Sequence, residues 1–128
     1  MEKKRTLIFY KDHFNDFFDK LPEKVKGKID EVLYMIMVLE RIPAKFFSHM
    51  NAYDGLYEIR IEYSSNIYRI FCCFDEGNLI VLFNGFQKKS QKTPQKEIEK
   101  ALKIKAEYFA YRQAGFKEKN KQKKDGKK

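Results

Sequence analysis

Several residue types are scarce in this 128-residue sequence, and each scarcity excludes a class of protein. Only 6 Gly and 3 Pro accompany 43% hydrophobic residues, a composition that indicates one small globular domain. The longest apolar run, Leu33 to Leu39, has seven residues, whereas ~20 are needed to span a bilayer. The N-terminal sequence MEKKRT lacks the hydrophobic region of a signal peptide, so we expect a cytoplasmic protein.

Cysteine and histidine are equally scarce. Cys72 and Cys73 are the only cysteines, and adjacent side chains of a strand point to opposite faces, so they cannot form a disulfide framework. His13 and His49 lie far from the cysteines and from each other in the sequence. We therefore expect no metal cluster and no other cofactor.

Acidic residues are scarce in one region only. Residues 1–87 hold 12 Lys and Arg against 13 Asp and Glu, whereas residues 88–128 hold 15 against 5, so the net charge of +9 arises entirely in the C-terminal part. Residues 88–113 carry +5 in chain that we expect to be folded, which predicts an anionic partner such as nucleic acid. Residues 117–128 carry the other +5. We expect one domain over residues 1–113 and a disordered, lysine-rich tail over residues 114–128.

Hydrophobic periodicity predicts the order of elements. Thr6–Tyr10 is an aromatic and β-branched run typical of a strand. Apolar residues then recur at helical spacing on both sides of Pro22, which predicts a helical hairpin that extends as far as Pro43. After a loop from Ala44 to Asp54 we expect three strands and a last helix, over Gly55–Tyr63, Asn66–Asp75, Asn78–Phe86 and Pro94–Gln113. The order β-α-α-β-β-β-α defines an α+β fold with a mainly antiparallel small sheet, packed by the N-terminal helical hairpin.

A two-residue turn at Ser64-Ser65 would fix the register of the first strand pair and place Arg60 directly opposite Arg69. Glu58 and Glu62 would share their sheet face. The other face would then be apolar and lie against the helical hairpin, and its members are Tyr57, Ile59, Ile61, Tyr63, Tyr68, Ile70, Cys72 and Phe74.

A similar turn at Glu76-Gly77 would pair Asp75 with Asn78 in the second hairpin and place Arg69 beside Asn84. Lys88 would follow on the same, solvated face as Arg69. The segment Leu79–Phe83 is apolar at every position, so we expect a central strand that is covered on both faces.

The two arginines have two possible explanations. Like charges directly opposed in a sheet, with Cβ atoms about 5 Å apart, are destabilising. A phosphate between Arg60 and Arg69 would reverse the sign of that interaction through paired, charge-assisted hydrogen bonds. Alternatively, Glu58 and Glu62 neutralise the arginines diagonally in an exposed salt-bridge lattice.

The segment Gln87–Thr93 places three lysines between a buried strand and the start of a helix. Backbone N–H groups and the helix dipole at that position favour an anion. The alternative is a mobile lysine loop without a partner. The last helix would extend this positive charge along one edge, where we expect nucleic-acid contacts from Lys92, Lys96, Lys100 and Lys103.

Three segments together resemble the RelE/ParE toxin superfamily, and within it the phage-derived, HigB-like branch. They carry, in order, an arginine after Glu and a hydrophobic residue, an arginine after Tyr, and the pattern KKxxxTPxxEIxxA. Element order extends the resemblance over residues 6–112. The segments are GLYEIRIEY (55–63), YRIFCCFD (68–75) and LIVLFNGFQKKSQKTPQKEIEKA (79–101).

The resemblance implies the toxin of a type II toxin–antitoxin pair. Such a toxin is a metal-independent endoribonuclease that cuts mRNA on the ribosome by attack of a ribose 2′-OH, and a small helix-turn-helix antitoxin holds it inactive. Carried onto this chain, the catalytic residues are Arg60, Arg69, Lys88 and Lys89. The arginines would stabilise the pentacoordinate phosphate. A lysine crowded by other cations would have a lowered pKa and could act as base or acid.

The chain departs from the RelE pattern because no His or Tyr of obvious catalytic type lies near its last strand. Tyr68 would point to the apolar face, Tyr108 and Tyr111 would belong to the core, and His13 and His49 are isolated. Two other functions therefore stay open. One is a ParE-like toxin that poisons DNA gyrase, and the other is an inactive remnant that only binds its antitoxin.

Overall fold

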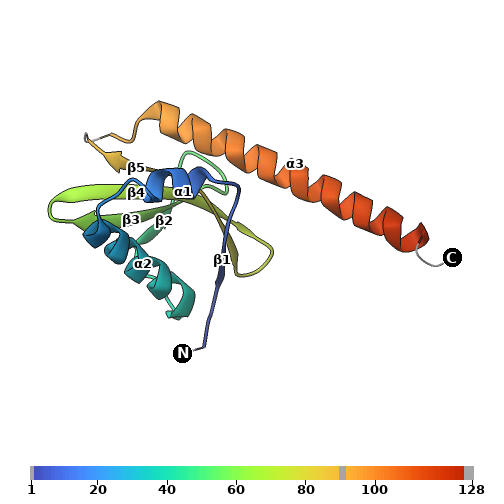
Figure 1. Ribbon diagram of the computed structural model, residues 1–128, viewed down its shortest axis with the longest axis horizontal. Helices are drawn as coiled ribbons and strands as arrows, with labels where there is room; N and C mark the ends of the chain where they lie inside the picture. The colour runs from blue at the N-terminus through green and yellow to red at the C-terminus, as the bar shows by residue number, and fades with distance from the viewer. Residues whose placement is uncertain (1, 90–91, 126–128) are drawn as a thin grey trace.

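The computed structural model describes residues 2–89 and 92–125 and confirms the predicted α+β fold (Figure 1). In the described part, five strands form one sheet and three helices pack on it. The elements are β1 (Thr6–Phe9), α1 (His13–Phe18), α2 (Glu23–Val38), β2 (Phe47–His49), β3 (Tyr57–Tyr63), β4 (Asn66–Asp75), β5 (Leu79–Lys88) and α3 (Gln95–Asp125).

The strand order in the sheet is β1-β5-β4-β3-β2. β1 pairs with β5 in parallel, and the other neighbours are antiparallel. β5 thus lies inside the sheet, and its residues Ile80, Val81, Leu82 and Phe83 are fully buried. The prediction of a central strand covered on both faces is confirmed, and it explains why this segment shows no alternation of polar and apolar residues.

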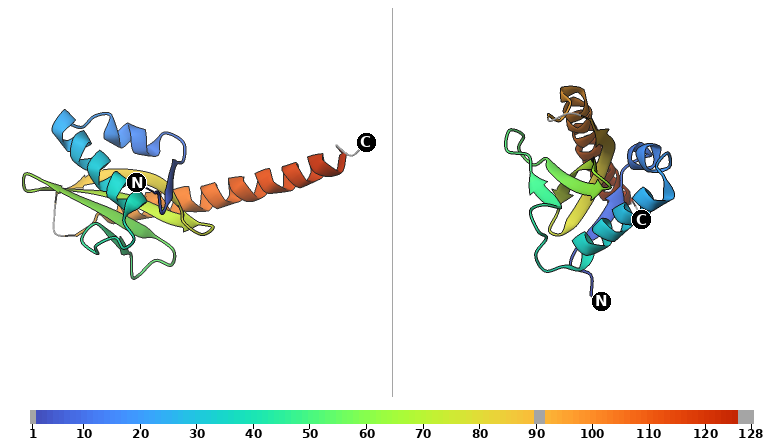
Figure 2. Two further views of the ribbon diagram at one scale, coloured as in Figure 1. Left: turned by 90° about the horizontal axis from the view of Figure 1, so that it is seen from below. Right: turned by 90° about the vertical axis from the view of Figure 1, so that its left-hand side faces the viewer.

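Helices cover both faces of the sheet (Figure 2). α1 and α2 pack on the face that holds Ile59, Ile61 and Ile70, as predicted for the helical hairpin. α3 packs on the other face through Ile98, Ala101, Ile104 and Tyr108, against a second apolar cluster that includes Phe71, Val81 and Phe83. The sequence predicts that this face is solvated. Instead α3 covers much of it, because Phe71 and Cys73 of β4 and Val81 and Phe83 of β5 are apolar and pack against the helix.

Three predicted boundaries are wrong. The helical hairpin ends at Val38 and not at Pro43. The predicted loop Ala44–Asp54 contains β2, whose three residues are held by pairing with β3, with Phe47 opposite Ile59. The last helix does not end at Gln113 but continues to Asp125, so α3 projects beyond the sheet (Figure 1). Helical residues therefore replace part of the predicted disordered tail, while residues 126–128 lie outside the described part. The domain limit at residue 113 remains a prediction.

The register of the first hairpin is as predicted, with Tyr63 opposite Asn66 and Arg60 opposite Arg69. Ser64 and Ser65 both have positive φ, 51° and 70°, as a two-residue hairpin turn with the twist of the strands requires.

The predicted register of the second hairpin is wrong. Asp75 pairs with Leu79 because the turn includes Asn78 and is one residue longer than expected. A bulge then adds a second residue to β5 between the Ile70 and Cys72 pairs, so Arg69 pairs with Phe86 and not with Asn84. The longer turn and the bulge each shift the register by one residue. The total shift beyond the bulge is two residues, so Phe86 and Lys88 keep their predicted face.

Candidate functional site

The sheet brings Arg60, Arg69 and Lys88 together on the α3 face, beyond the apolar cluster under α3. Arg60 and Arg69 are directly opposed on β3 and β4. Lys88, the last residue of β5, pairs with Ile67, two residues from Arg69 on the same face. We call these three residues and Glu58 the charged cluster.

Arg69 and Glu58 form a salt bridge and a hydrogen bond, in which Nη1 of Arg69 donates to Oε1 of Glu58. Both side chains are largely buried, with exposed fractions of 13% for Arg69 and 8% for Glu58. Within the described residues, the buried Nε of Arg69 has no hydrogen-bond partner. Arg69 therefore lies inside the sheet–helix layer and not on a solvated face.

Arg60 is held much more loosely. Its Nη2 forms an exposed ion pair with Oε2 of Glu62 at 3.5 Å, longer than an ordinary hydrogen bond, and its side chain is 33% exposed. Both arginines thus have a glutamate partner, as the salt-bridge explanation predicts, although the pair of Arg60 with Glu62 is longer and more exposed than that of Arg69 with Glu58. The phosphate between the arginines stays a prediction.

The environment of Lys88 favours its neutral form. Its pKa is lowered, first because partial burial removes water from the ammonium group and then because Arg69 and Arg60 repel a positive charge. Glu58 acts in the opposite direction and raises the pKa. The direction expected for a lysine crowded by cations is confirmed for Lys88, although burial contributes more than the arginines.

The bulge in β5 fixes the strand that carries Lys88. On the α3 side, the buried Asn84 donates hydrogen bonds from Nδ2 to the backbone oxygen and to Oε1 of Glu97, both at 3.2 Å. On the other side, Gly85 lies so close to the ring of Phe17 that an added Cβ would come within 2.5 Å of it. The bulge thus joins the sheet to the first turn of α3 and to α1.

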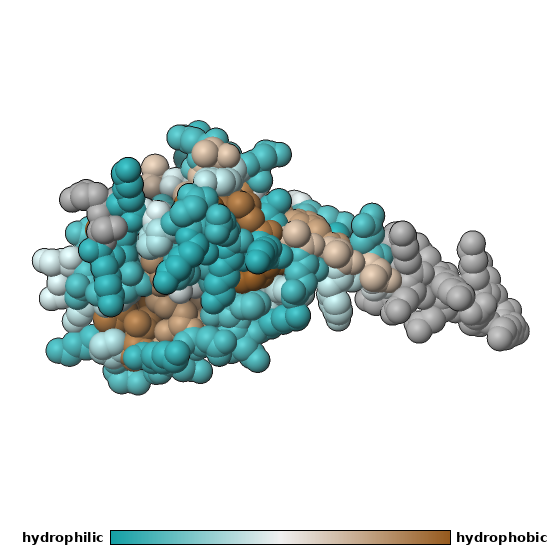
Figure 3. All heavy atoms as spheres, turned by 90° about the horizontal axis from the view of Figure 1, so that it is seen from above, coloured by the Kyte–Doolittle hydropathy of each residue, from teal (hydrophilic) through white to brown (hydrophobic). Residues whose placement is uncertain are grey.

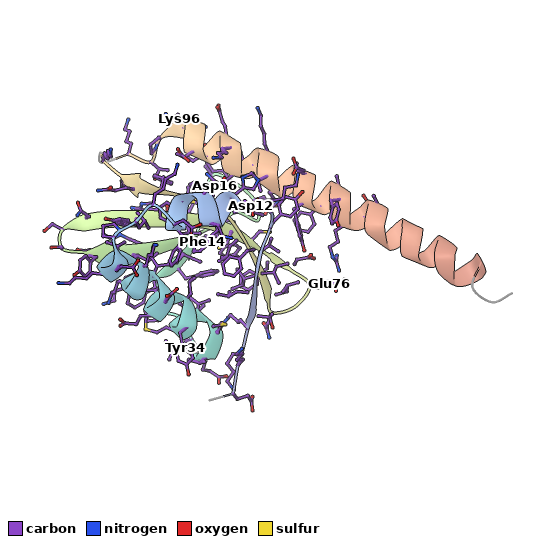
Figure 4. The ribbon with its side chains drawn as sticks, viewed as in Figure 1. Asp12, Phe14, Asp16, Tyr34, Glu76 and Lys96 are labelled. Carbon is purple, nitrogen blue, oxygen red and sulfur yellow. The ribbon has the colours of Figure 1, made fainter. Side chains whose placement is uncertain are left out.

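The lysines predicted to contact RNA begin next to the charged cluster. Lys89 and Lys92 are exposed on either side of residues 90 and 91, which lie outside the described part. Lys96, Lys100 and Lys103 are exposed on α3 at spacings of four and three residues, so they share one side of the helix. Figure 4 shows Lys96 at the start of α3 and Glu76 near the opposite end of the sheet. In Figure 3, hydrophilic side chains cover most of the surface seen from above.

The tyrosines and histidines that the sequence analysis considered do not join the charged cluster. Tyr68 is buried on the α1–α2 face, and Tyr108 is buried with its hydroxyl donating to Oδ2 of Asp75 at 2.6 Å. Burial and this carboxylate raise the pKa of Tyr108. Tyr111 is 70% exposed, so its predicted core role is wrong. His13 and His49 contact the rings of Tyr10 and Tyr57, respectively.

The salt-bridge explanation predicts an exposed lattice for Glu58, whereas its carboxylate is buried. Its place on the arginine face and diagonal to Arg69 follows from the register. Its burial does not follow from the register, because alternation along a strand gives the face of a side chain and not what covers that face. In the described part of the chain, no three His, Cys, Asp or Glu residues are grouped to hold a metal ion, and no helix has the length and apolar character needed to cross a membrane.

The five-stranded sheet with helices on both faces is consistent with a small RelE-like α+β fold. The family model for phage derived protein Gp49-like (DUF891) matches residues 16–106. The chain therefore belongs to the phage-derived Gp49-like family, which is a RelE-like, toxin-like family. No curated protein matches the chain.

Proposed function

We propose that this chain is the toxin of a type II toxin–antitoxin pair, of the HigB-like branch, and that it cuts mRNA on the ribosome without a metal ion. The observation that carries the proposal is the direct opposition of Arg60 and Arg69 next to Lys88, a lysine with a lowered pKa. Membership of a toxin-like family agrees with it. As the 2′-oxygen bonds to phosphorus, the bond from phosphorus to the 5′-oxygen would break, which leaves a 2′,3′-cyclic phosphate on one fragment and a 5′-hydroxyl, protonated by solvent water, on the other.

Each member of the cluster has a role that suits its environment. Arg60 is reachable from solvent and would bind the scissile phosphate as negative charge develops on it. Arg69 is largely buried and paired with Glu58, so it would add only part of its positive charge to the site. Lys88 in its neutral form would accept the proton of the attacking 2′-OH. Lys89 would contact the same phosphate or the next one.

The exposed lysines would bind the rest of the RNA. Lys96, Lys100 and Lys103 lie in one row on α3, which starts next to the charged cluster, and Lys92 precedes this row. Such a row attracts phosphates without reading bases. We infer that these four lysines set affinity, while the charged cluster sets the rate.

The proposed partner is a small helix-turn-helix antitoxin, and both proteins would act in the cytoplasm, where translating ribosomes are found. An antitoxin with acidic or apolar residues would complement the exposed lysines. Co-expression with the adjacent reading frame should restore growth, and the two proteins should co-purify. A neighbour that does neither would argue against a toxin–antitoxin pair.

The function is tested by inducing the chain in growing cells and mapping RNA ends by primer extension. We expect growth arrest, cuts inside translated frames, and no increase in cleaved DNA or in the SOS response. Damaged DNA with intact mRNA would instead indicate a ParE-like gyrase poison. Neither change would indicate a remnant that only binds its antitoxin.

The variant for this test is Arg60→Ala. Replacing Arg69 would leave Glu58 as an unpaired buried charge, and removing one partner of a buried pair strongly destabilises a fold. Arg69→Ala is therefore unsuited to the test, because Arg69 is not solvated as the sequence predicts. Arg60 is more exposed and lacks such a close partner, so its removal tests the chemistry and not the folding.

A further inference from the structure

We propose that Glu58 is a positioning residue of this site: its buried carboxylate holds the guanidinium of Arg69 and limits the net positive charge that the charged cluster presents to a phosphate. The inference rests on the proposed function and adds the residue that regulates how the cations of the site act. Glu58 itself touches neither RNA nor the reacting atoms in this account.

The hydrogen bond between Glu58 and Arg69 crosses from one strand to the next. Glu58 accepts a hydrogen bond from Nη1 of Arg69, although the residue directly opposite Glu58 is Phe71 and the one opposite Arg69 is Arg60. The carboxylate thus turns the guanidinium of Arg69 along the strand and away from Arg60. Without it, two guanidiniums would face each other across neighbouring strands, an arrangement that is unfavourable.

Glu58 and Glu62 differ in burial. Glu58 is 8% exposed, so solvent screens its charge poorly and its effect on nearby cations is strong. Glu62, on the same strand and face, is 58% exposed and lies 3.5 Å from Arg60. These two glutamates therefore form a natural comparison, because they have the same chemistry and differ in screening.

Charges of both signs surround Lys88. Arg69 of β4 and Arg60 of β3 face Lys88 and lower its pKa, whereas Glu58 of β3 raises it. Glu62 stands on the same face, opposite the Ile67 that pairs with Lys88, and Lys89 follows in the chain. From α3, Glu97 reaches β5 through Asn84. Glu58 is the buried acid in this set, so its removal should make Lys88 lose its proton at lower pH.

The test compares Glu58→Gln with Glu58→Asp and with the control Glu62→Gln. Single-turnover cleavage of ribosome-bound mRNA and RNA affinity are measured as functions of pH, and the side-chain ¹³Cε signal of Lys88 is titrated by NMR.

Glu58→Gln should lower the maximal cleavage rate about tenfold or more without weakening RNA binding. Both the Lys88 titration and the rise of the cleavage rate with pH should move to lower pH. Glu58→Asp should return the titration to its wild-type position and recover much of the rate. Glu62→Gln should resemble wild type.

The outcomes separate this inference from the proposed function. If the wild-type chain cuts no RNA but Glu58→Gln shifts the Lys88 titration, the function fails and the charge coupling stands. If the wild type cuts RNA and Glu58→Gln matches it in rate, RNA affinity and Lys88 titration, the inference is overturned. Equal effects of Glu58→Gln and Glu62→Gln would also overturn it, because burial would then not matter.

A second variant covers the possibility that Glu58→Gln does not fold. The double variant Glu58→Gln, Arg69→Gln leaves no unpaired buried charge at this position. Because Arg69 lowers the pKa of Lys88 more than Glu58 raises it, the Lys88 titration should move to higher pH than in wild type. An unmoved titration would overturn the inference.

Discussion

The two faces of the sheet differ in what their helices cover. The α1–α2 face is apolar along its whole length, whereas the α3 face is apolar only under α3 and carries the charged cluster beyond it. Neighbouring residues of β3 show the contrast, since Ile59 and Ile61 are fully buried on one face while Glu58 and Arg60 lie on the other. A buried ion pair stabilises a fold less than apolar packing does. We infer that the first face supplies stability and the charged end of the second supplies function.

The largest effect is expected on the α1–α2 face. Ile36 of α2 is fully buried there, so Ile36→Ala should lower the free energy of unfolding by about 2–5 kcal/mol through lost burial and a residual cavity. Denaturant unfolding measures the change. Tyr34, 49% exposed on the same helix, is the matched site, and Tyr34→Ala should change stability by no more than about 0.5 kcal/mol. Equal losses at the two positions would remove the contrast.

At the charged end, Lys88→Met should reduce cleavage with little change in stability. General base catalysis typically contributes about 10²–10⁴-fold, so a loss of that order is expected in single-turnover experiments. The direction in which the cleavage rate changes with pH shows whether Lys88 acts as base or as acid. A lysine acts as base only when neutral, so the wild-type rate should rise with pH and level off at a pKa below that of an ordinary lysine, 10.5.

That rise should be absent from the Lys88→Met profile after subtraction of hydroxide-catalysed cleavage. A wild-type rate that falls with rising pH through the same range would assign Lys88 the role of acid. Identical pH profiles for the two proteins would exclude Lys88 from proton transfer.

The apolar end of the α3 face should affect stability and not cleavage. Tyr108 donates a hydrogen bond to the buried Asp75, whose carboxylate also forms a salt bridge with Arg112 at 3.1 Å, and these contacts join α3 to the end of β4. Tyr108→Phe removes the hydrogen bond and should cost about 1–3 kcal/mol. Thermal unfolding together with single-turnover cleavage tests this separation. A variant that is stable but slow would show that α3 transmits structure to the charged cluster.

The smallest effect is expected from the end of the chain. Cutting after Phe116 removes a lysine-rich segment of α3 that lies beyond the residues packed on the sheet. If about four phosphates are bound, log affinity should fall with log salt at a slope near −3, since each phosphate contributes ~0.7 for single strands. The truncated chain should give a shallower slope and an unchanged cleavage rate at saturation. Loss of single-turnover cleavage at saturating RNA would place the segment in the active site.

The arginine pair could be predicted from the sequence because its causes are local. Ser64 and Ser65 form a two-residue turn with positive φ, and such a turn determines every pair that follows. The second hairpin could not be predicted in the same way. Its bulge is held by Asn84, whose side chain donates to Glu97 of α3, a contact between distant elements that no local pattern encodes.

The length of α3 and the burial of the site were missed for related reasons. Beyond Tyr108 the sequence has no apolar periodicity, so the pattern predicts the end of a helix although α3 continues to Asp125. Alternation along β3 places Glu58 on the arginine face but says nothing of what covers that face. Only the three-dimensional structure shows that Arg69 is largely buried, at 13% exposure, and that Arg60, at 33%, is less so.

The most direct test of the account is single-turnover cleavage of mRNA on translating ribosomes by the purified chain and by Arg60→Ala, with Arg41→Ala, an exposed arginine outside the sheet, as the control. Losing one contact to the developing charge typically costs about 10²-fold or more in rate. We predict that loss for Arg60→Ala, with an unchanged melting temperature and wild-type cleavage by Arg41→Ala. Cleavage by Arg60→Ala at the wild-type rate would contradict the assignment of catalysis to the charged end of the α3 face.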